Sequence, residues 1–166
     1  MTPVKRTALG RFPCSVARTM DLLGDWWTPL VLREVFYDVH RFDEIQRSLG
    51  IARNTLADRL ARLTAEGLLD RVPYQDKPVR YEYVLTEKGR DFFPVLAAMV
   101  RWGDKWLTAG EGAPVDLVHS CGQSAHARTV CSECGEPFTA ATVRSRMGPG
   151  FPAELAGKPE VQARFT

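Results

Sequence analysis

The fold is decided by residues 41–85, RFDEIQRSLGIARNTLADRLARLTAEGLLDRVPYQDKPVRYEYVL. Within this stretch, residues 52–66 carry leucines at the i, i+4 and i+7 spacing of one buried helix face. These leucines are Leu56, Leu60 and Leu63. The opposite side of the same helix carries polar side chains with hydrogen-bonding reach, at Asn54, Thr55, Asp58 and Arg62. A helix with these two faces suits the major groove of DNA.

The flanking residues complete the pattern of a winged helix-turn-helix. A short amphipathic helix over residues 42–49 is expected to end at Gly50, and the longer second helix at Gly67. Two runs of alternating polarity, residues 68–74 and 80–85, then predict a two-stranded hairpin, or wing. One amphipathic helix alone is most often a solvated surface helix. The order helix, turn, helix and hairpin with a basic tip instead indicates nucleic-acid binding.

Several segments between Cys14 and Trp106 carry a family resemblance. The most specific are Cys14 itself, GDWWTPLVLRE, RFDEI, NTLADRLARL, GLLDR and RYEYVLTEKG. With these segments the chain resembles the HxlR family of bacterial winged-helix transcriptional regulators. The resemblance implies a mainly α fold with a small β-wing. The chain departs from the family at Ala52, where members often have Ser or Thr, so the usual N-cap hydrogen bond is expected to be missing or made by another group.

Residues of the second helix and the wing are predicted to contact double-stranded DNA. The net charge of +2 is too small to attract DNA by a bulk basic field, so binding must depend on locally placed arginines. Helix residues are expected to reach bases and phosphates, and wing residues the backbone or the minor groove. The predicted DNA contacts are Arg41, Arg53, Asn54, Thr55, Asp58, Arg59, Arg62, Lys77 and Arg80.

A long helical stretch over residues 86–107 follows the wing. Pro94 is expected to kink or divide it just after Phe93. The apolar stripe is too wide for one partner, which favours a two-fold homodimer that reads an inverted repeat; a purely intramolecular core helix is the alternative. The predicted dimer interface comprises Phe92, Phe93, Leu96, Met99, Val100, Trp102 and Trp106.

The region before the helix-turn-helix is expected to be an arm followed by scaffold helices. Residues 1–13 carry basic side chains with little periodicity and form either an arm along DNA or the partner subunit, or a frayed terminus. Residues 14–23 and 26–37 each predict a helix. In the second of these helices, the buried residues are expected to be Trp27, Leu30, Val31, Val35 and Phe36. In some members of the resembled family a cysteine at the position of Cys14 senses electrophiles or oxidants. Cys14 is therefore the candidate sensor thiol, with an inert buried thiol as the alternative.

A linker over residues 108–117 separates the winged helix (14–107) from a Cys/His-rich module. Cysteines in a Cys-x-x-Cys-Gly sequence have the spacing with which two thiolates hold zinc, and Cys121-Gly122 resembles the same turn. We therefore expect a small zinc-ribbon-like module over residues 118–146 and a loosely ordered tail over residues 147–166. The predicted Zn²⁺ ligands are Cys121, Cys131, Cys134 and His119, with His126 as the alternative to His119.

Three other interpretations of the cysteines remain open. They are a disulfide, which a reducing cytoplasm disfavours, a redox switch that ejects zinc, and a metal-free hairpin. A complete set of four Cys and His ligands argues for structural rather than catalytic zinc.

The sequence lacks the signatures of the common enzyme and membrane classes. It has no Gly-rich phosphate loop, no Gly-x-Ser-x-Gly elbow and no carboxylate pair at a fixed spacing, so no enzymatic role is expected. No apolar run approaches the roughly 20 residues that span a bilayer, and a cytoplasmic protein is expected.

The function expected from these patterns is that of a dimeric, sequence-specific transcriptional repressor, released from its operator by a small-molecule or redox signal. Two alternatives are kept. One is a sensor whose ligand enters an aromatic region between the long helix, Trp26, Trp27 and the C-terminal module. The other is a non-specific architectural DNA-binding protein.

Overall fold

A computed structural model describes residues 12–165, which divide into two compact units. One unit comprises residues 22–127, and the other comprises residues 12–21 together with 128–165. Most of the predicted N-terminal arm, residues 1–11, lies outside the described residues. Within the described part of the chain, no helix has the length and apolar character needed to cross a membrane.

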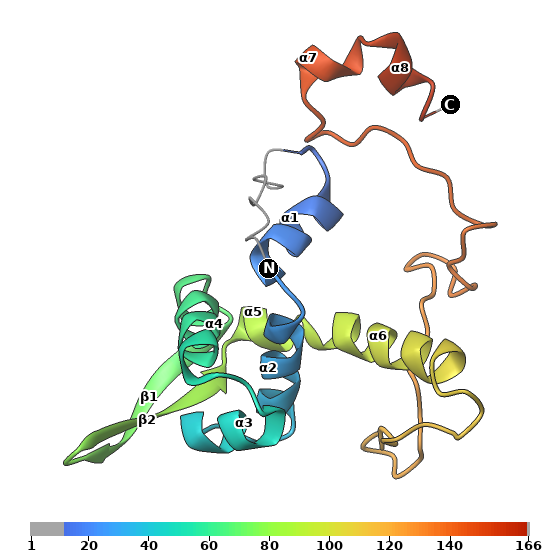
Figure 1. The fold of residues 1–166 in the computed structure, drawn as a ribbon. Helices are drawn as coiled ribbons and strands as arrows, with labels where there is room; N and C mark the ends of the chain where they lie inside the picture. Colours follow the sequence, from blue (N-terminus) through green and yellow to red (C-terminus); the bar gives the residue numbers. More distant parts are fainter. Residues whose placement is uncertain (1–11, 166) are drawn as a thin grey trace. The chain divides into compact units, whose positions relative to one another are not determined.

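The described residues form eight helices and two strands, of which α2, α3, α4 and the β1–β2 hairpin make the predicted winged helix-turn-helix (Figure 1). In chain order the elements are α1 (Ser15–Leu23), α2 (Trp27–Phe36), α3 (Phe42–Leu49), α4 (Arg53–Ala65), β1 (Leu69–Asp76), β2 (Val79–Leu85), α5 (Glu87–Arg90), α6 (Phe93–Trp106), α7 (Ala153–Ala156) and α8 (Pro159–Gln162).

The hydrophobic core forms where α4 packs on α2 and α3. The predicted face of α4 is confirmed, since Leu56, Leu60 and Leu63 are all buried. On α2, the expected burial of Val31 and Val35 is also confirmed. The main difference on α2 concerns three residues expected in the core that are only half-buried, namely Trp27, Leu30 and Phe36. Trp27 and Phe36 still pack against the edge of the core, and Thr28 and Leu32 of the same helix are buried.

The helix ends follow the local sequence. Gly50 ends α3 with a φ of +61°, a left-handed conformation that costs glycine no side-chain clash. Ala52 precedes α4 and, as expected from its side chain, makes no cap hydrogen bond. α4 ends at Ala65, and the turn that follows it contains Gly67 with a φ of +71° and is closed by the N–H of Leu68, which donates to the carbonyl of Leu63 at 2.9 Å. The helix-turn-helix corner is therefore built as the sequence predicts.

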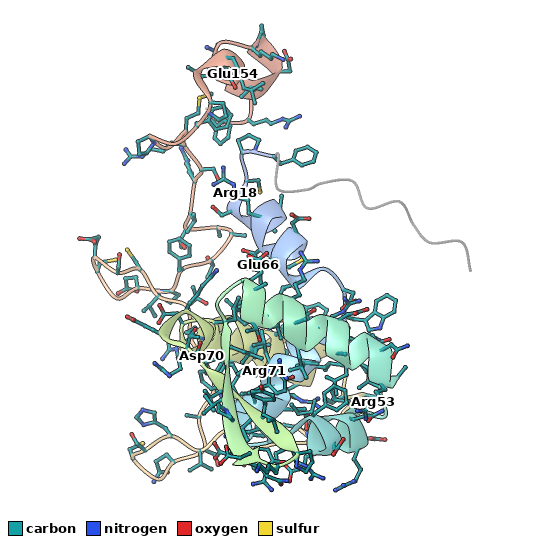
Figure 2. The ribbon with its side chains drawn as sticks, turned by 90° about the vertical axis from the view of Figure 1, so that its left-hand side faces the viewer. Arg18, Arg53, Glu66, Asp70, Arg71 and Glu154 are labelled. Carbon is teal, nitrogen blue, oxygen red and sulfur yellow. The ribbon has the colours of Figure 1, made fainter. Side chains whose placement is uncertain are left out.

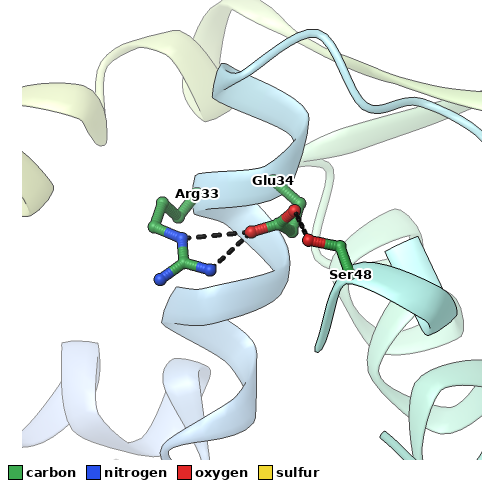
Figure 3. Close-up of polar contacts among 3 residues, drawn as sticks. All are labelled: Arg33, Glu34 and Ser48. Carbon is green, nitrogen blue, oxygen red and sulfur yellow. Dashed lines mark hydrogen bonds and ion pairs between the residues drawn. The ribbon is translucent and has the colours of Figure 1, made fainter. Parts of the chain in front are cut away.

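One buried charge joins α2 to α3 (Figure 3). The Glu34 side chain is nearly inaccessible, and its carboxylate accepts hydrogen bonds from the Arg33 guanidinium and from Ser48 Oγ at 2.5 Å. A buried carboxylate without such donors would be strongly destabilising. Ser48 therefore holds α3 at a fixed position on α2.

The wing is attached to the helices at its base. Strands β1 and β2 are antiparallel, and an isolated bridge joins Arg41 to Glu82 as a short third edge. Thr86 closes the hairpin, because its hydroxyl donates to the Gly67 carbonyl at 2.7 Å and accepts from the Gly89 N–H at 3.0 Å. A Cβ at Gly89 would lie 2.1 Å from the backbone oxygen of Leu68, so only glycine fits there. This contact explains the TEKG sequence after the wing.

The predicted long helix after the wing is divided into α5 and α6. The division precedes Phe93, at a turn over residues 91–92, rather than following it. Pro94 lies in the first turn of α6, where its missing N–H removes no helical hydrogen bond. Phe93 contacts Phe36 of α2, with ring centroids 5.1 Å apart.

The C-terminal extension, residues 118–165, has tight turns in the region expected to form a zinc-ribbon-like module. Between residues 118 and 146 the structure has two isolated bridges, Val118 with Ser124 and Val130 with Pro137, each closing a tight turn. The tail expected to be loosely ordered contains the one-turn helices α7 and α8. No described residue from 98 to 165 is buried, so this part of the chain has no hydrophobic core.

Candidate nucleic-acid interface

The face of α4 opposite the buried leucines, here called the outer face, carries polar side chains, as the helical spacing predicts. Asn54 and Asp58 are exposed, whereas Thr55 and Arg62 are half-buried and Arg62 takes part in a polar interaction. These side chains lie away from the leucines that pack on α2. The face therefore offers amide, hydroxyl and carboxylate groups that can pair with base edges.

A groove lined by arginines lies between α3 and the wing. It has a volume of about 560 Å³. Its cationic side chains are Arg41, Arg47, Arg53, Arg71 and Arg80. Two of them, Arg47 and Arg71, were not among the predicted contacts. For Arg71, the signal in the sequence is its position in the first predicted strand of the wing, which pairs with a strand that contains two tyrosines.

Three of these arginines stack on aromatic rings. The guanidinium carbon lies 4.4 Å from the ring centroid of Tyr74 for Arg41, 4.9 Å from Phe42 for Arg53, and 3.5 Å from Tyr81 for Arg71. Figure 2 shows Arg53 on α4 and Arg71 on β1. A stacked guanidinium is held in orientation while its N–H edge stays available for a phosphate.

Arg41 is also held by a carboxylate of the wing. Its Nε donates to Glu82 Oε1 at 2.9 Å, and this hydrogen bond raises the pKa of Arg41 above its ordinary value. The hydrogen bond also fixes the direction of the guanidinium, which is charged at physiological pH as in any arginine. At the wing tip, Lys77 and Arg80 are exposed, as expected for contacts to the DNA backbone.

Arg59 differs from the other predicted contacts because it points back to the protein. Its guanidinium forms an ion pair with Asp25, and both side chains are less than one-fifth exposed. The same Asp25 caps α2, with Oδ1 accepting from the Trp27 N–H at 3.0 Å. The structure thus gives Arg59 a role in holding α4 against the start of α2, and its DNA contact stays a prediction.

The predicted dimer residues fall on two sides of α6. Leu96 is buried and Phe92 packs on the same core, so neither side chain has much exposed surface with which to contact a second subunit. Phe93 touches α2, and Val100 lines pockets beside the helix. Met99, Trp102 and Trp106 are exposed, and Val95, missing from the prediction, joins them at the i, i+4, i+7 and i+11 positions of one stripe.

A pocket of about 420 Å³ lies between α6 and residues 113–126. Val100 and Leu117 supply apolar lining, and Lys105 and His126 supply basic side chains. Trp26 and Trp27, which the sequence analysis placed beside a ligand, are not part of this lining. The segment after α6 also contacts the helix through Arg101, whose guanidinium donates to the Ala127 carbonyl at 2.7 Å.

All four cysteines are free thiols. Cys14 is exposed at the start of α1 rather than buried, and its sensing role stays a prediction. Hydrogen bonds from the backbone N–H groups of Glu133 and Cys134 lower the pKa of the Cys131 thiol. Among residues 12–165, no three Cys, His, Asp or Glu side chains are grouped to hold a metal ion, and the zinc site stays a prediction.

Comparison with known families agrees with this geometry. The family model of the HxlR-like helix-turn-helix matches residues 22–111, more than half of the chain and all of the winged helix from α2 to α6. The chain belongs to the HxlR-like helix-turn-helix family. The similar proteins are named as transcriptional regulators.

Relatives of this HxlR-like chain include the uncharacterised HTH-type transcriptional regulator Rv3095 of Mycobacterium tuberculosis. It is 49% identical over 143 residues, which cover 86% of this chain and 90% of the relative. The crystal structure of PA1607, a proposed transcription factor, has a TM-score of 0.77 and 37% identity, and covers 86% of this chain and 100% of its own. Both matches are longer than the winged helix and so include part of the extension.

A third similar structure is the redox regulator HypR in its reduced form. Its TM-score is 0.52 and its identity 32%, over 55% of this HxlR-like chain and 92% of HypR. A match of this extent corresponds to a winged helix without most of the C-terminal extension.

We expect Arg59 and Arg53 of the HxlR-like fold to differ in their effect on stability. Arg59→Ala removes a charged hydrogen bond from a mostly buried Asp25 and should lower the free energy of unfolding by about 1.5–3 kcal/mol. Arg53→Ala breaks an exposed pair with Asp43 and should cost less than about 1 kcal/mol. Urea unfolding followed by circular dichroism at one protein concentration measures both. Equal losses would contradict the structural role of Arg59.

Proposed function

We propose that this HxlR-like protein is a homodimeric, sequence-specific repressor that binds an inverted-repeat operator. The observation that carries the proposal is the arginine-lined groove beside the outer face of α4. Helix-turn-helix proteins insert the second helix into the major groove, while flanking basic residues contact the phosphates. In this arrangement α4 reads bases, and the groove and wing hold the adjacent backbone.

The assignment of roles follows from exposure. Asn54 and Asp58 are exposed on α4 and can reach base edges, the amide to adenine and the carboxylate to cytosine. The stacked Arg41, Arg53 and Arg71 instead suit phosphates, because their planes are fixed against aromatic rings at the edge of α4.

Arg53→Ala and Arg71→Ala should each weaken binding to all sequences by a similar factor, because each removes a phosphate contact. The slope of log affinity against log salt should fall by about one for each variant. Asn54→Ala should instead reduce the preference for operator over scrambled DNA.

Arg144→Ala, an exposed arginine of the extension, is the control and should change neither quantity. Fluorescence anisotropy with DNA from upstream of the protein's own gene measures both. Equal wild-type affinity for scrambled DNA would refute the proposal in favour of a non-specific architectural protein.

The homodimer is proposed from the exposed stripe of α6. Trp102 and Trp106 are 59% and 63% exposed, and Met99 and Val95 continue the same stripe over three helical turns. Apolar residues at a 3–4 spacing on one helix form a seam that packs against a second helix. A second copy related by a two-fold axis supplies the same stripe and presents two α4 helices to successive turns of DNA.

Trp102→Asp should convert the dimer to a monomer, because it places a charge in the centre of the proposed seam. Light scattering coupled to size exclusion should then give half of the wild-type mass. Operator affinity should fall on the order of tenfold or more, since the two half-sites no longer bind as one unit. Phe138→Asp changes an exposed aromatic residue of the extension and should leave the mass unchanged. A wild-type chain that is already monomeric at micromolar concentration would contradict the dimer.

The releasing signal is proposed to act at Cys14. The thiol is exposed at the start of α1, and a similar structure is that of a redox regulator. The pocket between α6 and residues 113–126 favours a second candidate, a small amphipathic effector bound beside the dimer helix.

A quinone electrophile distinguishes the two signals. If Cys14 is the sensor, quinone treatment should reduce operator affinity of the wild type and leave Cys14→Ser unaffected, because the thiolate that forms the adduct is gone. Anisotropy before and after treatment measures this. An equal response of Cys14→Ser would refute Cys14 as the sensor. Loss of that response in Val100→Trp would then support the pocket, and its persistence would point to one of the other three thiols.

A further inference from the structure

The pocket of about 420 Å³ beside α6 has two walls from one compact unit. One wall is α6 itself, and the other is the segment of residues 113–126 that follows it. Both walls belong to the unit of residues 22–127, so the pocket lies within that unit. Its volume falls in the range of small-molecule sites, roughly 300–1,000 Å³. The chemistry of the lining then indicates which kind of molecule fits.

The wall opposite α6 is a turn with its own hydrogen bonds. The N–H of Ala125 donates to the Leu117 carbonyl at 2.8 Å, and an isolated bridge joins Val118 to Ser124. The Ser124 hydroxyl donates to Asp116 Oδ2 at 3.0 Å. These bonds hold the lining side chains of the turn in a defined arrangement without a hydrophobic core.

Apolar side chains line one part of the pocket. Ala97 and Val100 come from α6, and Val115 and Leu117 come from the opposite wall. Val115 is 45% exposed and Leu117 is half-buried, so a ligand with an apolar body would cover surface that the protein leaves in water. A narrower recess adjoins this part, because it shares three of its lining residues, and its aromatic side chains are Phe36, Tyr37 and Phe93.

Two opposite charges on α6 line the pocket without pairing with each other. Arg101 and Asp104 are three residues apart, a spacing at which opposite charges on a helix commonly pair. The Arg101 guanidinium instead donates to the Ala127 carbonyl at 2.7 Å, which leaves its other N–H groups for a ligand. Within residues 12–165, the Asp104 carboxylate has no hydrogen-bond or ion-pair partner, although the residue is half-buried.

The remaining charged groups of the lining are less available. The Lys105 ammonium lies 4.6 Å from the ring centroid of Trp106, and the Asp116 carboxylate accepts the Ser124 hydroxyl. His126 precedes the residue that anchors Arg101 and lines the same pocket. The pocket therefore offers one cation and one anion on neighbouring turns of α6, beside an apolar surface.

We propose that this pocket binds a zwitterionic small molecule, an α-amino acid with an apolar side chain. The ligand carboxylate binds Arg101 and His126, the ligand ammonium binds Asp104, and the apolar side chain lies between Val100 and Leu117. A ligand with only an acid would leave the Asp104 carboxylate unpaired in a half-closed site, and one with only an amine would leave Arg101 unpaired. As the effector of the proposed repressor the ligand rests on that function, whereas its binding to the pocket does not.

Titration calorimetry of the full-length protein with three matched compounds tests the proposal. L-Phenylalanine carries both charges, 3-phenylpropionate lacks the ammonium, and phenethylamine lacks the carboxylate. Wild type should bind L-phenylalanine about tenfold or more tightly than either analogue, because each analogue loses one charged hydrogen bond.

Two charge variants assign the two ends of the ligand. Asp104→Asn should weaken L-phenylalanine and phenethylamine about tenfold and leave 3-phenylpropionate unchanged. Arg101→Gln should weaken L-phenylalanine and 3-phenylpropionate and leave phenethylamine unchanged. Glu111→Gln and Arg144→Gln remove exposed charges outside the lining and are the matched controls. Asp104→Asn breaks no described bond of the folded chain, so its result stands even if Arg101→Gln releases the turn from α6.

Three results would overturn the proposal. They are a wild type that binds neither L-phenylalanine nor L-leucine at millimolar concentration, equal affinity for L-phenylalanine and either analogue, and full affinity for L-phenylalanine in Asp104→Asn. Fluorescence anisotropy with operator DNA, with and without L-phenylalanine, tests the link to DNA separately. An unchanged operator affinity would refute the effector role of a ligand that calorimetry supports. A wild type without operator binding would refute the repressor, and calorimetry would still decide the pocket.

Discussion

The winged helix depends on one packing constraint, the burial of the leucine face of α4 against α2. Leu60 lies at the centre of that face and is completely buried. Because helical residues follow each other at about 100°, burying this side determines which residues of α4 point outward. The Asp25–Arg59 pair holds the rotation of α4 about its axis, and the Glu34 carboxylate holds α3 beside it. The packing of the leucines in the core thus determines the orientation of the outer face of α4.

Charge placement explains how a chain with a net charge of only +2 presents a basic surface. The arginines of the groove come from α3, α4 and both strands of the wing, and they converge because the wing folds back along α3. Stacking on Tyr74, Phe42 and Tyr81 restrains three of them before DNA arrives. A side chain that is already ordered loses less entropy on binding, so few charges suffice where they are prearranged. The overall amino-acid composition therefore does not reveal this local concentration of positive charge.

The parts of the fold that sequence reasoning predicted correctly are those specified by nearby residues. The leucine spacing of α4, the glycine at the end of α3 and the alternation in the wing are local signals. Arg59 lies at the border between the two faces of α4, and its inward direction depends on Asp25, which is 34 positions earlier. The same ambiguity separates Leu96, buried in the core, from Met99, exposed on the stripe, although both fit one broad helical face. Whether a residue at the border between two helix faces is buried or exposed depends on contacts with residues that are distant in the sequence.

Helix α6 connects the winged helix to the C-terminal residues that follow it. One side packs on the core through Leu96, a second carries the exposed stripe proposed for dimerisation, and a third contacts the extension through Arg101. Because a helix is stiff, a shift imposed on one side is felt on the others. The pocket of about 420 Å³ lies between α6 and the segment that follows it. In the homodimer proposed above, a ligand bound in this pocket would act through α6 on the spacing of the two α4 helices, which is the quantity that an inverted repeat selects.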